Sequence, residues 1–261
     1  MEISYSELPL LGNPVLENVD RLIAIGAKKI ELMMDGEPWD NVDGKWSKLA
    51  KELVTRNVKF SVHPPAYDTN LTSESGLIRE AVYDLFKHAI EFAASVGAQH
   101  IVLHPGFLGS PAFSKDTAIK RAMEATQKLS AFAAFYKVNL AFENVGYNGQ
   151  SIYDMEEYLS VLDYFDENVG YLIDIGHAHL NGWDIPALIR RAAPRLLGFH
   201  FHDNDGKSDA HLPIFEGSVD WDALFTAIRE TCPDCNIIFE YAPFVSIEQY
   251  PKDEKKLLTI L

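Results

Sequence analysis

The sequence has few cysteines, few basic residues and no long hydrophobic run. Its two cysteines form a single Cys232-Pro-Asp-Cys235 segment, and no second pair is present to complete a zinc ribbon. We interpret them as thiols between a helix end and a strand. No apolar run reaches the ~18 residues that a membrane span needs, and MEISYSELPLLG lacks the basic start of a signal peptide. We therefore expect a cytoplasmic protein without a membrane partner.

Acidic residues outnumber basic ones: there are 38 Asp and Glu against 23 Lys and Arg, and the formal net charge is −15. This balance disfavours broad, non-specific attraction to nucleic acid or to an anionic membrane surface. It remains compatible with a local basic patch. A cluster of carboxylates that binds cations would itself contribute to the acidity. The charge therefore argues against nucleic acid as a partner.

Short apolar segments rich in β-branched and aromatic residues recur along the whole chain. Most lack polar alternation, as expected for strands buried on both faces of a parallel sheet. Longer segments lie between them, and residues 78–96 and 119–136 carry apolar side chains at helical spacing. The expected strands are Glu2–Ser6, Lys29–Met34, Lys59–His63, His100–His104, Asn139–Asn144, Gly170–Ile175, Leu197–His202 and Asn236–Tyr241.

An internal similarity supports a repeated strand and helix unit. Residues 24–32 and 95–103 have the same form, in which a helix ends on Gly and two polar residues lead into a strand. Asn13 and Pro14 predict a helix start, with Asn13 as the cap and Pro14 at the first helical position. Such alternation predicts right-handed crossovers and a parallel sheet. Eight units fit a closed barrel better than an open sheet of about five or six strands, so we expect a single α/β (β/α)8 TIM barrel domain over residues 1–261.

Six consecutive expected strands end in or near a side chain that can bind a metal ion. In a (β/α)8 barrel all of these ends converge on one mouth. One such residue has an ordinary structural explanation, but burying six of them without a cation would cost too much free energy. Mixed His, Asp and Glu ligands suit zinc, manganese, cobalt or iron better than calcium. The six are His63, His104, Glu143, Asp174, His200 and Glu240.

The segments after the sixth and seventh strands add further candidates. A second imidazole lies one helical turn beyond the sixth strand, and an Asp-X-His follows the seventh; these residues are His177, Asp209 and His211. They are candidates for additional metal ligands or for substrate contacts. His202 shares a strand face with His200, so it is either a substrate contact or a residue that supports a ligand. We interpret Glu31, on the second strand, as a structural carboxylate.

These residues lie in segments that resemble the xylose isomerase-like TIM-barrel superfamily. That superfamily contains sugar and sugar-phosphate isomerases and epimerases together with endonuclease IV. The resemblance covers nearly the whole chain, and it is carried by HPPAYDTNL, VLHPG, FEN, DIGH, HFHDNDGKSDAHLP, EGSVDW and the Glu of IFEY.

The isomerase and epimerase branch implies one divalent metal ion, foremost zinc or manganese, held by Glu143, Asp174, His200 and Glu240. In that branch Glu143 and Glu240 are also the catalytic acid/base pair, and His177 contacts a substrate oxygen. The endonuclease IV branch implies three zinc ions and phosphodiester hydrolysis. The first ion would be held by His63, His104 and Glu143, the second by the four residues above, and the third by His177, Asp209 and His211.

Two departures from these branches guide the choice between them. The isomerase and epimerase branch often has an Arg after the seventh strand, where this chain has Gly206 and Lys207, so Lys207 is a candidate anion contact to substrate. Endonuclease IV has Gly-Glu-Gly after its Asp-X-His, where this chain has Phe215-Glu216-Gly217. We expect a metal-dependent isomerase or epimerase of a small sugar, sugar acid or sugar phosphate. A zinc phosphodiesterase resembling AP endonucleases is the alternative, and a homodimer is the default assembly.

Overall fold

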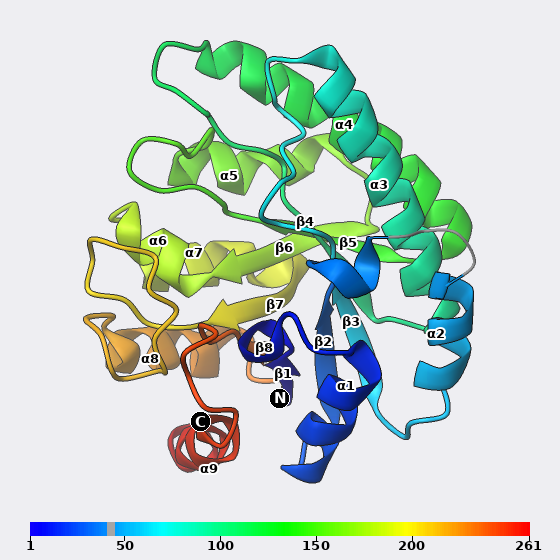
Figure 1. The fold of residues 1–261 in the computed structure, drawn as a ribbon. Coiled ribbons are helices and arrows are strands. Elements are labelled where there is room, and N and C mark those ends of the chain that lie inside the picture. Colours follow the sequence, from blue (N-terminus) through cyan, green and yellow to red (C-terminus); the bar gives the residue numbers. More distant parts are fainter. Residues whose placement is uncertain (41–44) are drawn as a thin grey trace.

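The computed structural model describes residues 1–40 and 45–261, which form a closed barrel of parallel strands (Figure 1). Each strand pairs with the next along the chain, and the last pairs with the first. This arrangement confirms the predicted (β/α)8 TIM barrel fold. The strands are β1 (Glu2–Ser6), β2 (Lys29–Met33), β3 (Lys59–His63), β4 (His100–Leu103), β5 (Asn139–Glu143), β6 (Val169–Asp174), β7 (Leu196–Phe201) and β8 (Asn236–Phe239).

The α-helices lie outside the barrel (Figure 1). The described helices are α1 (Val15–Ala24), α2 (Lys45–Leu53), α3 (Gly76–Ser95), α4 (Lys115–Tyr136), α5 (Met155–Val161), α6 (Ile175–Leu180), α7 (Ile185–Ala192), α8 (Trp221–Thr231) and α9 (Gln249–Ile260). Short 3-10 helices, η1 (Leu8–Leu10), η2 (Glu37–Trp39), η3 (Leu162–Tyr164) and η4 (Ala193–Arg195), occupy connections. Among the described helices, none is long and apolar enough to cross a membrane.

The two similar segments of the sequence end their helices in the same way. Gly26 and Gly97 follow α1 and α3 with positive φ angles of 107° and 66°, which glycine adopts without steric cost. The next amide bonds back to the last helical turn, from Ala27 to Leu22 at 3.0 Å after α1. One start was predicted wrongly. Helix α1 begins at Val15 with Pro14 as its cap, because Pro14 has an extended ψ of 131° and so lies outside the helix. The Asn13 amide donates instead to the Leu10 carbonyl at 2.8 Å.

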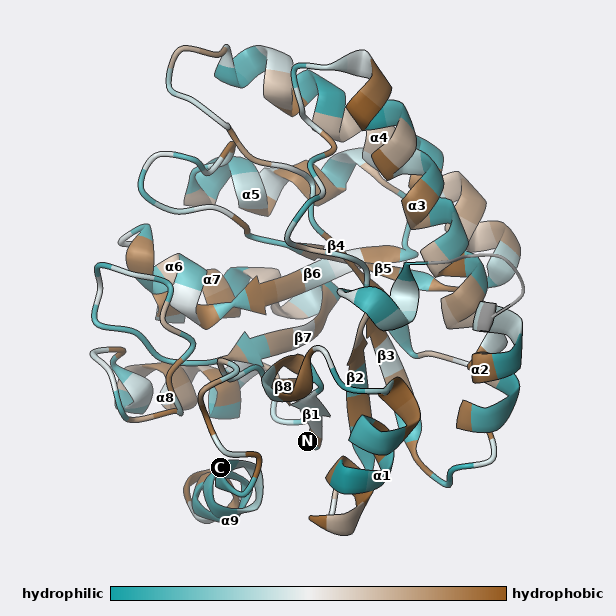
Figure 2. Cartoon of the chain, in the orientation of Figure 1, coloured by the Kyte–Doolittle hydropathy of each residue, from teal (hydrophilic) through white to brown (hydrophobic). Residues whose placement is uncertain are grey.

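The barrel encloses little apolar material of its own. Most of the apolar core lies between the strands and the surrounding helices, and Figure 2 shows hydrophobic strands beside helices of mixed hydropathy. Inside the barrel, the buried residues Val102, Ala141, Leu172 and Ile238 form a small separate cluster. Polar residues of the strands can therefore occupy much of the barrel interior, towards the carboxyl ends where the candidate ligands lie.

Candidate metal centre

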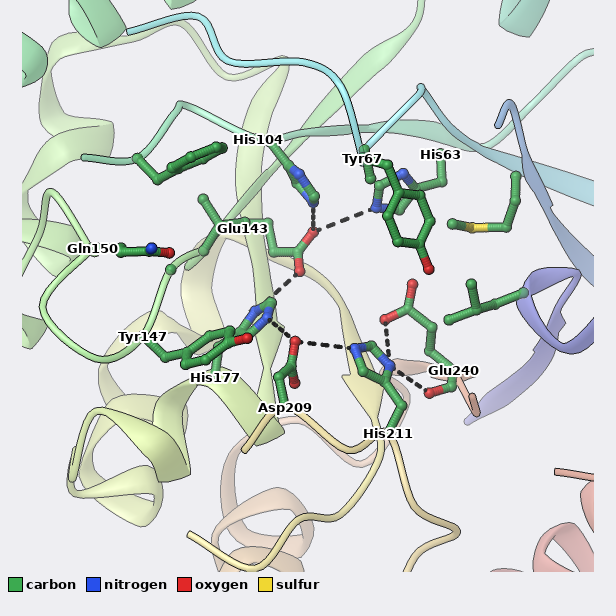
Figure 3. Close-up of a pocket in the computed structure, with 16 residues that line it drawn as sticks. His63, Tyr67, His104, Glu143, Tyr147, Gln150, His177, Asp209, His211 and Glu240 are labelled. Carbon is green, nitrogen blue, oxygen red and sulfur yellow. Dashed lines mark hydrogen bonds and ion pairs between the residues drawn. The ribbon is translucent and has the colours of Figure 1, made fainter. Parts of the chain in front are cut away.

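A cavity of about 430 Å³ opens at the carboxyl ends of the strands (Figure 3). Residues in the strands or in the segments that follow them line it, so the barrel gathers side chains that are far apart in the sequence. Asp174 and His200 are fully buried and contact residues that line the cavity. The predicted residues that line it directly are His63, His104, Glu143, His177, Asp209, His211 and Glu240.

Glu143, at the end of β5, lies among four imidazoles. Its Oε2 atom is 2.9 Å from His104 Nε2 and 3.9 Å from His63 Nε2. Its Oε1 atom is 3.4 Å from His200 Nδ1 and 3.6 Å from His177 Nδ1. Only 1% of Glu143 is exposed, so water screens these interactions poorly. One carboxylate thus joins two groups of candidate ligands.

The four residues predicted to hold a metal ion surround one nitrogen atom. His200 Nδ1 is 3.4 Å from Glu143 Oε1, 3.8 Å from Asp174 Oδ2 and 3.4 Å from Glu240 Oε2. These residues lie at or next to the ends of four consecutive strands, β5 to β8. The structure therefore brings the predicted set together at one end of the barrel.

A further group lies on the opposite side of Glu143 from His63 and His104. Asp209 Oδ2 is 3.2 Å from His177 Nε2 and 3.3 Å from His211 Nε2. Figure 3 shows a continuous series of close polar contacts from His63 through Glu143 to Glu240. Two sets expected from sequence have all their donor atoms within 4.8 Å of one another: His63, His104 and Glu143; and His177, Asp209 and His211. Of the expected four-residue set, Glu143, Asp174 and His200 meet this distance, whereas Glu240 meets it with Glu31 and His200 and with His202 and His211.

Local backbone structure fixes Asp174. Its carboxylate caps the start of α6 by accepting the His177 amide at 2.6 Å. Asn144, at the end of β5, bonds both to the Asp174 amide (2.8 Å) and to the Asp174 carbonyl (2.9 Å). Gly176 is required in this turn because an added Cβ would lie 2.0 Å from the His202 ring. The DIGH segment thus holds Asp174 against the ring of His202.

The loop that carries Asp209 and His211 is held by Asp203, next to β7. Asp203 and Leu212 exchange backbone hydrogen bonds of 2.8 and 2.9 Å. The Asp203 carboxylate also accepts the Val219 amide at 3.1 Å and the Trp221 indole N–H at 2.7 Å. His211 has a φ of 44°, a left-handed conformation that this closed loop imposes.

Charges in the site reinforce one another. Burial raises the pKa of Glu143, but the neighbouring His104 and His200 outweigh burial and hold it well below its usual range. Burial lowers the pKa of His211, but the adjacent Asp209 outweighs burial and raises it to about 9. The pKa of Asp209 is lowered in turn by His177 and His211, against burial. The neighbouring imidazoles therefore stabilise the ionised forms of the Glu143 and Asp209 carboxylates.

The tautomers of two histidines fit metal binding. His63 Nδ1–H donates to the carbonyl of the next residue at 2.7 Å, and His211 Nδ1–H donates to the Glu240 carbonyl at 2.9 Å. A ring that kept this Nδ1–H while it bound a metal ion would offer the ion its Nε2, which faces the carboxylate of Glu143 or of Asp209. Metal-binding histidines characteristically anchor their second nitrogen in this way.

Two buried atoms in the centre lack a hydrogen-bond partner among the described residues, namely His177 Nδ1 and Asp209 Oδ1. Unsatisfied buried polar atoms are rare in folded proteins, and an unplaced ion is one explanation for them. Nitrogen and carboxylate donors together suit zinc or manganese. The residues present therefore fit a divalent metal ion.

His202 and Lys207 do not line the cavity. His202 is fully buried, and its Nε2 lies 3.0 Å from Asp174 Oδ2, which favours support of a ligand over contact with a substrate. Lys207 is exposed on a turn where its amide bonds to Asp205 Oδ1 at 3.0 Å. This position gives no support to the predicted substrate contact of Lys207. The position of Lys207 depends on the conformation of its loop, and no periodic pattern in the sequence predicts a loop conformation.

We expect Lys207→Ala to change kcat/KM by no more than about twofold, because substitutions of exposed residues alter free energies little. Steady-state kinetics on wild type and variant would measure this. A loss of tenfold or more would show that Lys207 reaches the substrate, contrary to its position in the structure.

Sequence reasoning did not assign roles in the site to Asn144 or Glu31. The sequence shows Asn144 only as the residue that follows Glu143. Its hydrogen bond to Asp174 at the end of β6 depends on the strand pairing of Glu143 with Leu172. Glu31 was interpreted as structural, yet its Oε1 atom lies 3.0 Å from His200 Nε2. An isolated carboxylate in an apolar strand was the available signal for Glu31.

Three curated relatives show the range of proteins that this chain resembles. It is 29% identical over 197 residues to an uncharacterized protein of Methanocaldococcus jannaschii, covering 74% of each chain. It is 25% identical over 239 residues to the inosose isomerase of Bacillus velezensis, covering 88% of this chain and 84% of the isomerase. It is 28% identical over 173 residues to the probable endonuclease 4 of Thermoplasma volcanium, covering 62% of this chain and 58% of that protein.

Solved structures share the fold over the entire chain. A D-tagatose 3-epimerase-like protein superposes with a TM-score of 0.86 at 20% identity, covering 100% of this chain and 97% of the other. The IOLI protein with a bound zinc atom superposes with a TM-score of 0.83 at 21% identity, covering 100% and 98%. Residues 19–258 match the model of the xylose isomerase-like TIM barrel family. The chain belongs to the xylose isomerase-like TIM barrel family.

Proposed function

We propose that this protein is a metal-dependent isomerase or epimerase that acts on a small, unphosphorylated sugar or cyclic polyol ketone. One observation carries the proposal. Glu143 and Glu240 both line the cavity, and each has a carboxylate oxygen 3.4 Å from the same atom, His200 Nδ1. Two carboxylates on different strands can therefore reach one substrate in the cavity, as proton abstraction and return require.

The residues that would hold the metal ion are His200 and the three carboxylates around its Nδ1 atom, those of Glu143, Asp174 and Glu240, with zinc or manganese as the best-suited ions. When bound, the ion would polarise the carbonyl and hydroxyl oxygens of the substrate and stabilise the negative charge that develops, a contribution of about several kcal/mol.

The two glutamates divide the proton transfers. One removes a proton from the carbon beside the substrate carbonyl, and the other returns a proton to a neighbouring atom or to the opposite face. His177, Asp209 and His211 line the cavity and can bond substrate hydroxyl groups. Tyr67 and Tyr147 also line it and can cover the apolar face of a sugar ring.

The side chains that line the cavity favour an unphosphorylated substrate. Among the described residues, no Lys or Arg lines the cavity, and phosphate groups are characteristically bound by these side chains or by helix N-termini. The cavity volume of about 430 Å³ suits a single sugar ring. Similarity to the inosose isomerase of Bacillus velezensis and to the D-tagatose 3-epimerase-like structure supports this substrate class. The zinc atom of the IOLI protein supports the metal.

We expect the metal-loaded protein to incorporate solvent deuterium beside the carbonyl of at least one unphosphorylated ketose or cyclic polyol ketone. Proton removal and return exchange that hydrogen with solvent. Incubation of a substrate panel in deuterium oxide, followed by NMR and mass spectrometry, would measure it. Phosphorylated analogues of the reactive sugar serve as the matched comparison and should exchange more slowly. Exchange with none of the unphosphorylated compounds would contradict the proposal.

A zinc phosphodiesterase is the second candidate function. It is favoured by the three candidate ligand sets, two of which share Glu143, and by similarity to the probable endonuclease 4 of Thermoplasma volcanium. Against it stand the net charge of −15 and the absence of a described Lys or Arg in the cavity lining, because duplex binding depends on phosphate neutralisation. The metal count per chain and cleavage of DNA at an abasic site separate the two candidates.

A further inference from the structure

Glu31 is a buried carboxylate near the centre of the barrel, outside the cavity lining. It lies on β2, and its side chain has no exposed surface. Its Oε1 atom is 3.0 Å from His200 Nε2, and its Oε2 atom accepts the Ser61 hydroxyl at 3.1 Å. Its third polar neighbour, His100, has Nε2 3.9 Å from Glu31 Oε2. The short contacts of Glu31 therefore point to β3 and β7 inside the barrel.

A buried carboxylate in this position is costly unless it is paired. The small apolar cluster inside the barrel, which includes Val102 and Leu172, supplies no hydrogen bonds to it. Its hydrogen-bonding partners within about 3 Å are the His200 ring, at 3.0 Å, and the Ser61 hydroxyl, at 3.1 Å. The His200–Glu31 contact is thus the main compensation for burying the carboxylate.

The same contact determines which nitrogen His200 presents to the candidate metal centre. Nε2 faces Glu31, whereas Nδ1 faces Glu143 and Glu240 at 3.4 Å each. A ring that bound a metal ion through Nδ1 would carry its one proton on Nε2, where Glu31 can accept it. The Nδ1 lone pair is then available on the side where a metal ion would bind. A flipped ring would break the Glu31 contact.

We propose that Glu31 is a positioning residue that fixes the orientation and tautomer of His200 and thereby sets the metal affinity of the centre. The inference rests on the proposed function, because it assumes that His200 binds the metal ion. The comparison with His63 and His211 supports it: their second nitrogens are anchored by backbone carbonyls, whereas His200 depends on a side chain. A substitution can remove that anchor without altering a ligand.

The test measures zinc affinity on metal-free protein by competition with a chromophoric chelator. Loss of such an outer partner characteristically weakens metal binding about 10- to 100-fold, and we expect this for Glu31→Ala. Glu31→Gln should lie between the alanine variant and wild type, because its amide oxygen can still accept from Nε2. Ser61→Ala is the matched control, because Ser61 contacts Glu31 but not His200, and it should bind zinc within about threefold of wild type.

A second measurement separates positioning from general destabilisation. Nitrogen-15 spectra of histidine-labelled, zinc-loaded protein report which ring nitrogen carries the proton, and wild type should show His200 protonated on Nε2. Glu31→Ala should lose this signature while keeping a cooperative thermal transition. If Glu31→Gln and Glu31→Ala both bind zinc as wild type does and keep the tautomer, the positioning role is wrong and the proposed function stands. If wild type binds no zinc through His200, the proposed function itself fails.

Discussion

Glu143→Gln should lower turnover about 10²- to 10⁴-fold, the contribution that one acid/base group typically makes. The amide has nearly the shape of the carboxylate but can neither carry negative charge nor accept a substrate proton. Glu143 also faces His104 at 2.9 Å and His200 at 3.4 Å, so the substitution removes the charge that these imidazoles share. Rates would be measured with the compound that shows deuterium exchange.

The control for this change is Glu216→Gln, which makes the same chemical substitution at an exposed site outside the cavity lining. It should retain the wild-type rate and the wild-type melting temperature. Glu143→Gln should still unfold cooperatively, because the barrel core does not depend on that charge. Turnover within tenfold of wild type in Glu143→Gln would remove this residue from the proton transfer.

Glu240→Gln provides the complementary result if the reaction is an epimerisation. Each glutamate would serve one face of the substrate carbon, so each variant should lose epimerisation. Each should also retain slow solvent exchange with a different epimer, since the remaining carboxylate can still remove and return a proton on its own face. Loss of all exchange in both variants would instead indicate that the two residues cannot be separated from metal binding.

The strands were predictable because barrel strands are short, apolar and regularly separated by amphipathic helices. The ends of β1 to β8 differ from the predicted ends by no more than two residues. Once eight parallel strands are assumed, the gathering of His63, Glu143 and Glu240 follows, because all the carboxyl ends lie at one mouth. The sequence therefore predicted which residues would meet, although not what they bind.

Contacts that depend on register and on loop shape were not predictable. The pairing of Glu31 with Ser61 places both residues inside the barrel. The contact of His200 with Glu31 then depends on the position of β7 on the other side of the barrel interior, which the pattern of one strand does not predict. The position of Lys207 was not predictable either. Its loop is determined by turn hydrogen bonds such as that to Asp205, and the sequence gives these no periodicity.

Removal of metal ions should lower the melting temperature by roughly 10 °C. A ligand at 1,000 times its Kd stabilises the native state by about 4 kcal/mol, and each kcal/mol shifts the melting temperature of a chain of this size by about 2–4 °C. Without the ion, the buried carboxylate of Glu143 faces imidazoles, and that of Asp174 keeps imidazoles and the His177 backbone amide. Thermal unfolding with and without chelator, followed by readdition of zinc or manganese, would measure the effect.

The number of ions released distinguishes the two candidate functions. On the proposed function, elemental analysis should find fewer than three firmly bound ions per chain. His211→Ala should then change substrate affinity or rate without emptying the centre around His200 Nδ1. His211 Nε2 faces Asp209 at 3.3 Å, and its hydrogen bond to Glu240 is made to the backbone carbonyl, so the Glu240 side chain stays in place. A chelator should still lower the melting temperature of His211→Ala as it does that of wild type.

The isomerase proposal would be overturned in favour of the phosphodiesterase by three results together: three zinc ions in wild type, a loss of one ion in His211→Ala, and cleavage of abasic DNA. An unchanged melting temperature in chelator, with no ion found, would contradict both, because each assigns the buried carboxylates to a cation.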